Sequence, residues 1–238
     1  MKKQSFKRRT FIKTSTFTGA GLALGFTFVP LVNSATGGRV SVSGEKGAEL
    51  GLWIRIAPDG TITLIAPSSE MGQGVNTSLS MILAEELEAD WKSIKTETAP
   101  VNSDYKNPEQ PMQLTGGSNS IKGFWEPLRE VGAAAREMLI TAAAQKWDVS
   151  VGECKAQSGY IIHQKSSRKL GYGELVEAAG KLDVPSDPTL KAPEEYSLVG
   201  KPVPRLDLPD KINGTAKFGI DIRLPGMLFA TVRQSPVF

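Results

Sequence analysis

Two short glycine-rich segments carry the residue types in this 238-residue chain that are best suited to hold a polar ligand. They are residues 70–77, with the sequence EMGQGVNT, and residues 115–120, with the sequence TGGSNS, and each precedes a pattern typical of a helix. The start of a helix offers unpaired N–H groups and the positive end of the helix dipole, and glycine lets a backbone approach a ligand closely. We therefore predict binding of a phosphate or a polar heterocycle, with these candidate residues: Gly72, Gln73, Gly74, Thr77, Ser118, Asn119 and Ser120.

Each segment alone also has a simpler interpretation. A glycine-rich turn followed by Ser, Thr or Asn is a common way to cap a helix. Residues 70–77 contain no Lys and lack the spacing of a nucleotide-binding P-loop, and no fingerprint of three spaced glycines for a dinucleotide follows a strand. The two familiar nucleotide motifs are thus excluded, whereas capping and ligand binding both stay open.

Other reactive residues are scarce. The chain contains only one Cys and one His. These counts exclude a disulfide framework, a Cys-rich zinc or iron–sulfur site and a two-histidine metal site. We expect Cys154 to be a half-buried structural residue, His163 to be exposed and inert, and residues 85–88 to place their carboxylates on a solvated helix face. Glu70 is the only acid of the first segment, and we predict no catalytic residue and no metal ligand.

The elements that must position these segments mix helices and strands. Trp53 and β-branched residues around Pro58-Asp59-Gly60 predict a hairpin, and spacings of three and four predict helices. The class is therefore α+β. The expected elements are strands 52–57 and 61–66, helix 75–90, strand 91–99, loop 102–113, a helix from 121 or 127 to 147, hairpin 154–164, helix 172–181 and strands 216–222 and 228–232.

Several separated motifs together resemble one family. Residues 69–74 (SEMGQG) with the helix through 84–87 (AEEL) look like the pterin-binding loop of molybdenum hydroxylases, the xanthine oxidase and aldehyde oxidoreductase family. Residues 115–120, followed by 132–139 (GAAAREML), resemble the family's second such element. Three further stretches resemble the start of its hammerhead domain, 201–207, 211–214 and 224–230. The order of the motifs is most similar to the isoquinoline 1-oxidoreductase β-subunit group.

The resemblance implies a molybdopterin cofactor with molybdenum, commonly as the cytosine dinucleotide. Gly72, Gln73 and Gly74 would then contact the pterin or the ligands beside the metal, with Thr77 at the helix start, and residues 118–120 would bind the phosphate or nucleotide part. It implies hydroxylation of an N-heterocycle or aldehyde with oxygen from water, and iron–sulfur clusters on a small companion subunit. The family's Phe-containing glycine loop and its late catalytic Glu are not found in these 238 residues, so we expect the N-terminal part of a larger subunit, inactive by itself.

The first 34 residues have the pattern of an export signal. They contain six basic residues and no acid, and the basic part is followed by a weakly hydrophobic stretch. The sequence Arg8-Arg9-Thr10-Phe11-Ile12 resembles the twin-arginine signal. This predicts the twin-arginine export machinery as a partner and a periplasmic or exported location, with membrane association left open. Without these residues, 22 basic and 25 acidic residues remain, a net charge of −3, so the formal charge of +3 for the whole chain indicates no nucleic-acid partner.

The predicted organisation has five parts. They are the signal at 1–34, a flexible Gly/Ser-rich linker at 35–49, a molybdopterin-binding-type domain at 50–182, an extended Pro-rich linker at 183–209 and the truncated start of a hammerhead domain at 210–238. Two other functions stay open at this point: an exported binding module without a cofactor, and an unrelated phosphate- or nucleotide-binding protein.

Overall fold

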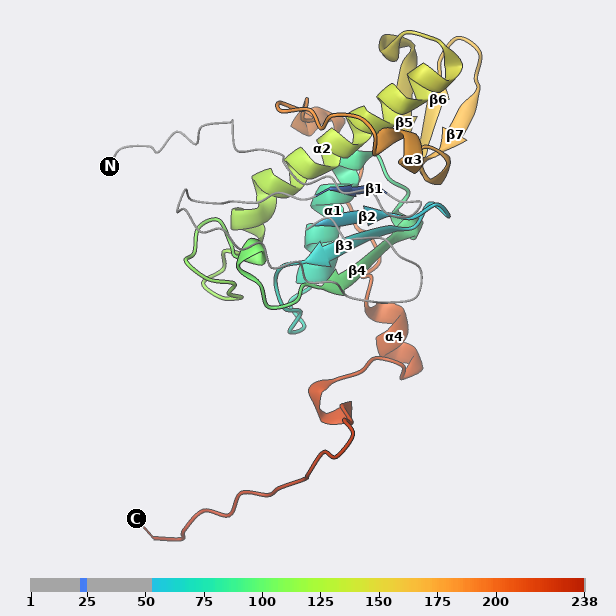
Figure 1. The fold of residues 1–238 in the computed structure, drawn as a ribbon. Coiled ribbons are helices and arrows are strands. Elements are labelled where there is room, and N and C mark those ends of the chain that lie inside the picture. Colours follow the sequence, from blue (N-terminus) through green and yellow to red (C-terminus); the bar gives the residue numbers. More distant parts are fainter. Residues whose placement is uncertain (1–21, 25–52, 238) are drawn as a thin grey trace, which may run out of the picture. The chain divides into compact units, whose positions relative to one another are not determined.

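A computed structural model describes residues 22–24 and 53–237 of the chain (Figure 1). The paired arginines and the predicted linker at 35–49 lie outside the described residues. The described chain separates after Leu206 into a large unit and a small one, residues 207–238. The segment 183–206, predicted as part of a linker, therefore belongs to the large unit.

The main sheet of the large unit has four strands in the order β1-β2-β3-β4. They are β1 (Leu22–Leu24), β2 (Ile54–Ile56), β3 (Ile62–Ala66) and β4 (Ile94–Thr98). β2 and β3 are antiparallel and form the predicted hairpin, in which Gly60 adopts a φ of 85° and donates to the carbonyl of Ala57 at 2.9 Å. β1 pairs with β2, which places three residues of the predicted export signal in the sheet.

One crossover connects parallel strands. β4 runs parallel to β3, and helix α1 (Val75–Leu87) is the connection between them. A parallel pair needs such a crossover because a tight turn cannot join two strands of the same direction. This βαβ unit is a finding of the structure, and it places the first glycine-rich segment between the end of β3 and the start of α1.

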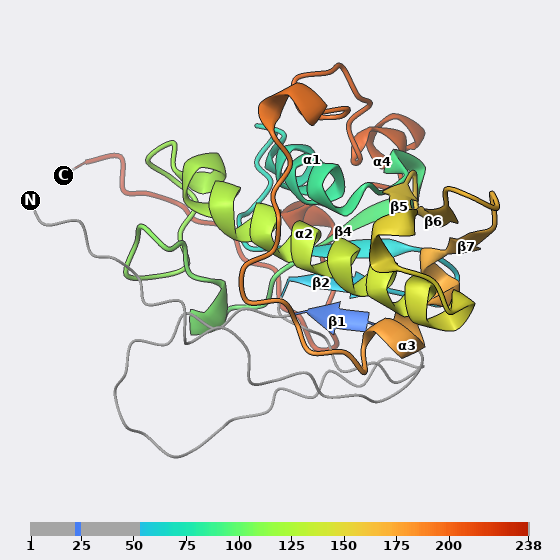
Figure 2. The ribbon, with the colours of Figure 1, turned by 90° about the horizontal axis from the view of Figure 1, so that it is seen from above.

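A long helix and a small sheet complete the large unit. α2 (Ser120–Trp147) continues through Pro127, and near its C-terminal end lies a sheet of β5 (Cys154–Gln157), β6 (Tyr160–His163) and β7 (Lys169–Gly171) (Figure 1). A short α3 (Val176–Ala179) follows. Figure 2 shows α1 and α2 side by side above the main sheet. The α+β class and the two main helices are confirmed, whereas β7 was not predicted.

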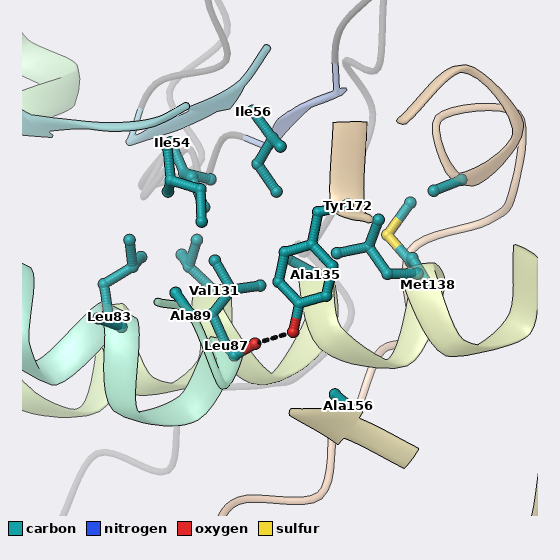
Figure 3. Packing of buried hydrophobic residues seen from close by; sticks show 14 of the residues in the cluster. Ile54, Ile56, Leu83, Leu87, Ala89, Val131, Ala135, Met138, Ala156 and Tyr172 are labelled. Atoms are coloured by element: carbon teal, nitrogen blue, oxygen red, sulfur yellow. Dashed lines mark hydrogen bonds between the residues drawn. The ribbon is translucent and has the colours of Figure 1, made fainter. Parts of the chain in front are cut away.

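The core lies between the main sheet and the two helices. Ile54 and Ile56 point from β2 toward α1 and α2, where Leu83 and Val131 are fully buried (Figure 3). Tyr172 is also buried, and its hydroxyl donates to the carbonyl of Leu87 at 2.6 Å. Because burial disfavours the phenolate, the pKa of Tyr172 is raised well above its usual value. The sheet and both helices therefore share one apolar core that fixes where α1 and α2 begin.

The prediction for His163 was wrong. Its ring is 6% exposed, its Nδ1 lies 2.6 Å from the Ser166 hydroxyl, and its Nε2 lies 3.0 Å from a carboxylate oxygen of Glu153. The alternating pattern of β6 places the side chain of His163 on the buried face together with Ile161. It is a satisfied structural histidine far along the chain from the glycine-rich segments.

The small unit contains α4 (Leu208–Asn213) and a single 3₁₀ turn at Gly219–Asp221. The strands predicted at 216–222 and 228–232 are not formed, so that prediction was wrong. Ile220 and Leu228 are 83% and 91% exposed. A β-branched run becomes a strand only where another strand takes up its backbone hydrogen bonds, and no described residue does so here.

Candidate functional site

The structure brings the two glycine-rich segments together. The first follows β3 and precedes α1, and the second precedes α2. The backbone N–H of Ser69 donates to the Thr115 hydroxyl at 2.8 Å, a direct bond between the segments across 46 residues of chain. Since α1 and α2 pack side by side on one sheet, their N-terminal ends face the same region. We call the two segments with Ser68 and Ser69 the paired loops (residues 68–77 and 115–120).

Glu70 organises the first loop. One oxygen of its carboxylate accepts from the N–H groups of Gly72 and Gly74 at 2.8 and 2.9 Å, and the other accepts from Asn76 at 3.1 Å. A carboxylate at this place satisfies donors at the N-terminus of α1 and interacts favourably with its dipole. Gly72 and Gly74 have φ values of 99° and 83°, in the left-handed region that favours glycine. The Glu70 carboxylate thus has a structural role at the place where an anion would otherwise bind α1.

Gln73 and Thr77 also bond within the protein. The Gln73 side chain accepts from the N–H of Met71 at 2.5 Å and donates to the Ser69 carbonyl at 2.8 Å, so it folds back over its own loop. The Thr77 hydroxyl, on the first turn of α1, accepts from the N–H of Leu206 at 3.1 Å. Both predicted residues lie at the site, and both help to fix its backbone.

The second loop turns sharply before α2. Gly117 and Ser118 have φ values of 63° and 55°, and Ser118 is exposed. The carbonyl of Asn119 accepts from the N–H of Gly123 at 2.8 Å and from the amide of the fully buried Asn107 at 3.0 Å. Asn107 was missed by sequence reasoning because one Asn in a polar, Pro-containing loop carries no signal of burial.

Buried oxygen atoms without a partner concentrate at the paired loops. Among the described residues, four buried side-chain atoms lack a hydrogen-bond partner, and three of them are Ser68 Oγ, Asn76 Oδ1 and Asn119 Oδ1. The fourth, Ser80 Oγ, lies one turn further along α1. An unpaired buried polar atom costs about 1–3 kcal/mol, so such atoms are rare and their clustering requires an explanation. A polar ligand with donor groups would satisfy them.

The loop glycines leave room for a ligand. A Cβ atom placed at Gly72, Gly74 or Gly116 would meet no atom within 4 Å. By contrast, a Cβ at Gly132 in the middle of α2 would lie 2.7 Å from the Leu83 carbonyl oxygen. Gly132 is therefore needed for helix packing, whereas the loop glycines face open space. The paired loops thus combine glycines of positive φ, unpaired buried oxygens and a backbone with free space around it. This combination fits a polar, extended ligand.

The prediction that residues 85–88 form a solvated face was wrong. Glu85 and Glu86 are only 2% and 0% exposed, although both lie on α1. Glu86 pairs with Arg129 at 2.7 Å and Arg136 at 3.3 Å on α2, and Glu85 with Lys191. Helical spacing places Glu85 and Glu86 opposite α2 and residues 189–199, and the sequence does not show that a later segment covers this face.

Backbone donors complete the pairing of Glu85. Its two oxygens accept from the N–H groups of Ser197, Leu198 and Val199 at 2.6–3.0 Å. Burial raises the pKa of Glu85, but the Lys191 ammonium and these N–H groups outweigh burial, and the net shift is downward. Burial lowers the pKa of Lys191, and its bonds to Glu85 and Glu88 reverse this to a net increase. We name residues 187–206, which lie over this cluster, the strap.

Comparison with known proteins identifies the family. A family model described as a molybdopterin cofactor-binding domain matches residues 2–222. The chain belongs to this family, within the molybdenum hydroxylases. The predicted family and the predicted fold class are thereby confirmed, and the cofactor class of this family is molybdopterin with molybdenum.

Three curated relatives are similar to the chain. The beta subunit of isoquinoline 1-oxidoreductase from Brevundimonas diminuta is 34% identical over 78% of this chain and 28% of that protein. The membrane-bound aldehyde dehydrogenase (pyrroloquinoline-quinone) of Gluconacetobacter polyoxogenes is 32% identical over 98% of this chain and 30% of that protein. The B subunit of nicotinate dehydrogenase from Pseudomonas putida is 31% identical over 80% of this chain and 16% of that protein. The chain thus spans less than a third of the length of these relatives.

Three further observations concern the described residues. No helix among residues 53–237 is both long and apolar enough to cross a membrane. In the same part of the chain, no group of three or more His, Cys, Asp or Glu side chains gathers as a metal site would require. Arg205 also reaches the first loop, where it donates to the Gly72 carbonyl at 3.1 Å. Sequence reasoning placed Arg205 in a motif of the predicted linker and assigned it no role.

Proposed function

We propose that the paired loops bind molybdopterin in its cytosine dinucleotide form, as part of a larger polypeptide that hydroxylates an N-heterocycle or an aldehyde with oxygen from water. The observation that carries the proposal is the cluster of unpaired buried oxygens at Ser68, Asn76 and Asn119. Amino groups of a pterin and of a cytosine are donors of the kind these oxygens lack. The cofactor supplies the oxygen transfer and accepts the electrons, and the protein supplies binding and orientation.

The two loops would divide the cofactor between them. No atom lies within 4 Å of the Cβ positions of Gly72 and Gly74, and Asn76, with its unpaired oxygen, follows two residues later. This part of the first loop therefore suits the planar pterin. The second loop begins α2 with Ser118, Asn119 and Ser120, and no described group accepts from the N–H of Ser118 or Ser120. Such free donors at a helix start suit a phosphate. The first loop does not, because Glu70 already occupies its donors.

The names of the relatives suggest the remaining parts of the function. Two of them are the beta and B subunits of enzymes named for isoquinoline and nicotinate. We therefore propose an N-heterocycle or an aldehyde as substrate and a small iron–sulfur protein as partner. The basic start of the chain supports export by the twin-arginine machinery to the periplasm.

Cofactor analysis of the natural-length polypeptide that contains this chain tests the proposal. It would be produced with its partner protein in a host that makes the cofactor, and molybdenum, pterin and released nucleotide would be measured. We expect molybdenum, pterin and CMP in equal amounts. Pterin without CMP would refute the dinucleotide form. A quinone without pterin, as the name of the Gluconacetobacter relative suggests for that protein, would refute molybdopterin binding.

Gln73→Ala sharpens the test, because Gln73 bridges Met71 and Ser69 within the loop. We expect the molybdenum content to fall in this variant. The matched control is Gln164→Ala, a change of the same type in the turn after β6, which should leave the content unchanged. Equal molybdenum in both variants and the unchanged protein would remove Gln73 from the site.

A further inference from the structure

The strap follows a path that buried carboxylates fix. Glu85 binds three successive backbone N–H groups of the strap at residues 197–199. Glu86 accepts from the N–H of Lys191 at 3.0 Å and is itself 0% exposed. A charged acceptor with several short donors is among the strongest hydrogen-bond arrangements in proteins. The strap is therefore held rigidly along α1.

The same segment ends on the first glycine-rich loop. The N–H of Leu206 donates to the Thr77 hydroxyl at 3.1 Å, and the indole N–H of Trp91 donates to the Pro204 carbonyl at 3.3 Å. These two bonds flank Arg205 and fix its backbone. Its guanidinium reaches the Gly72 carbonyl at 3.1 Å and a Glu70 carboxylate oxygen at 3.4 Å.

These contacts form one connected arrangement. Glu70 gathers the N–H groups of the loop, and Arg205 binds both the Glu70 carboxylate and the carbonyl of Gly72. The Glu70 side chain is 14% exposed and that of Arg205 is 38% exposed, so the pair is partly shielded from water. Gly72 has a φ of 99° and nothing within 4 Å of its Cβ position, so the bonds of Arg205 add to those that Glu70 and Gln73 make within the loop.

We propose that Arg205 is a positioning residue for cofactor binding: held by the strap, it locks residues 70–74 in the conformation that receives the pterin. This inference rests on the proposed function of the paired loops. Arg205 acts through Glu70 and the Gly72 carbonyl and need not touch the cofactor. Because the loop is already ordered, cofactor binding loses less conformational entropy than it would with a flexible loop.

The test compares Arg205→Met, Arg205→Lys and a control, Lys201→Met, in the natural-length polypeptide. Lys201 is an exposed cation of the same strap, so the control removes an equal charge. The first measurement is hydrogen exchange of the amides in residues 70–76, with and without cofactor. Loss of a charge-assisted bond should speed this exchange by about tenfold in Arg205→Met, with a smaller effect in Arg205→Lys and none in the control.

The second measurement is molybdenum and pterin content, together with the melting temperature. We expect a several-fold lower content in Arg205→Met, partial recovery in Arg205→Lys and melting temperatures close to that of the unchanged protein. If Arg205→Met fails to fold, Arg205→Lys still provides the comparison. It keeps the positive charge but cannot bind the Gly72 carbonyl and the Glu70 carboxylate with one planar group.

The outcomes separate the two proposals. Unchanged exchange and unchanged cofactor content in Arg205→Met would overturn the positioning role. Faster exchange with unchanged content would overturn its link to the cofactor. Absence of pterin from the unchanged protein would refute the proposed function instead, while the exchange data would still report whether Arg205 locks the loop.

Discussion

Buried polar groups lie in two regions of the large unit, beneath the strap and beneath the paired loops. Under the strap, Glu85 and Glu86 have cations and backbone donors for both oxygens. Under the loops, Ser68, Asn76 and Asn119 each keep a buried oxygen without a partner among the described residues. Both regions include residues of α1, within about three turns of each other.

This difference distinguishes a structural region from the proposed binding region. Fully paired buried charges contribute little net stability compared with apolar residues, but breaking one pair is costly, so they fix a geometry. Unpaired oxygens lower stability and can be tolerated where a ligand later supplies the donors. We therefore expect substitutions under the strap to affect stability, and substitutions at the loops to affect ligand content.

The largest effect is expected for Glu86→Gln. The substitution leaves Arg129 and Arg136, whose side chains are 13% and 12% exposed, without their shared counter-charge. We expect the free energy of unfolding to fall by about 3–5 kcal/mol, measured by urea denaturation. The control is Glu97→Gln, which removes an exposed partner of Arg55 and should cost no more than about 1 kcal/mol. Similar losses in the two variants would contradict the buried network.

Glycine substitutions should separate the regions in the same way. Gly132→Ala places a methyl group 2.7 Å from the Leu83 carbonyl oxygen and 2.9 Å from the Glu86 Cβ, both on α1. Such overpacking should destabilise the protein by about 1–3 kcal/mol. Gly116→Ala has no atom within 4 Å and needs no positive φ, so its unfolding free energy should not change. If Gly116→Ala were the more destabilising variant, the proposed open space at the second loop would be absent.

Acid should affect the strap through Glu85. Its pKa is lowered in the folded protein, because Lys191 and three backbone donors outweigh burial. Glu85 therefore contributes stability that is present above the unfolded value of 4.5 and is lost as the pH falls through the lower folded value. Unfolding experiments should show stability declining more steeply below pH 4.5 in the unchanged protein than in Glu85→Gln. Glu177→Gln, at an exposed ion pair with Lys181, should follow the unchanged protein. Equal slopes in Glu85→Gln would contradict this role.

Local sequence patterns were sufficient to predict much of the large unit. The turn at residues 58–60 defined the hairpin, and apolar spacing defined α1 and α2. Both glycine-rich segments could be predicted as candidate site elements because their residue types are unusual, and their binding role stays a prediction. The contact between them includes the bond from the Ser69 N–H to the Thr115 hydroxyl, which no local pattern encodes.

Long-range burial was the part that the sequence did not reveal. Three acids near the end of α1 are typical of a solvated face, whereas Glu85 is buried and bonded to Lys191 and residues 197–199, over 100 positions later. The same reason explains His163, which Glu153 and Ser166 satisfy within a small sheet. Arg205 had no assigned role because its partner Glu70 lies 135 positions away.

A small effect on stability is also expected for Asn119→Ala, and this variant tests the paired loops most directly. The side chain of Asn119 makes no capping bond to α2, and its Oδ1 is buried without a partner. Removing an unsatisfied acceptor removes its desolvation cost, and this gain offsets the packing lost with the side chain, so the unfolding free energy of the cofactor-free protein should change by less than about 1 kcal/mol. Cofactor content should nevertheless fall, because the oxygen that would accept from the ligand is gone. Asn107→Ala is the contrasting control: its fully buried amide bonds the Asn119 carbonyl, so its loss should destabilise the apoprotein by about 1–3 kcal/mol. If Asn119→Ala destabilised the protein as much as Asn107→Ala and left the cofactor content unchanged, Asn119 would be structural, and the distinction between the two regions would not hold at α2.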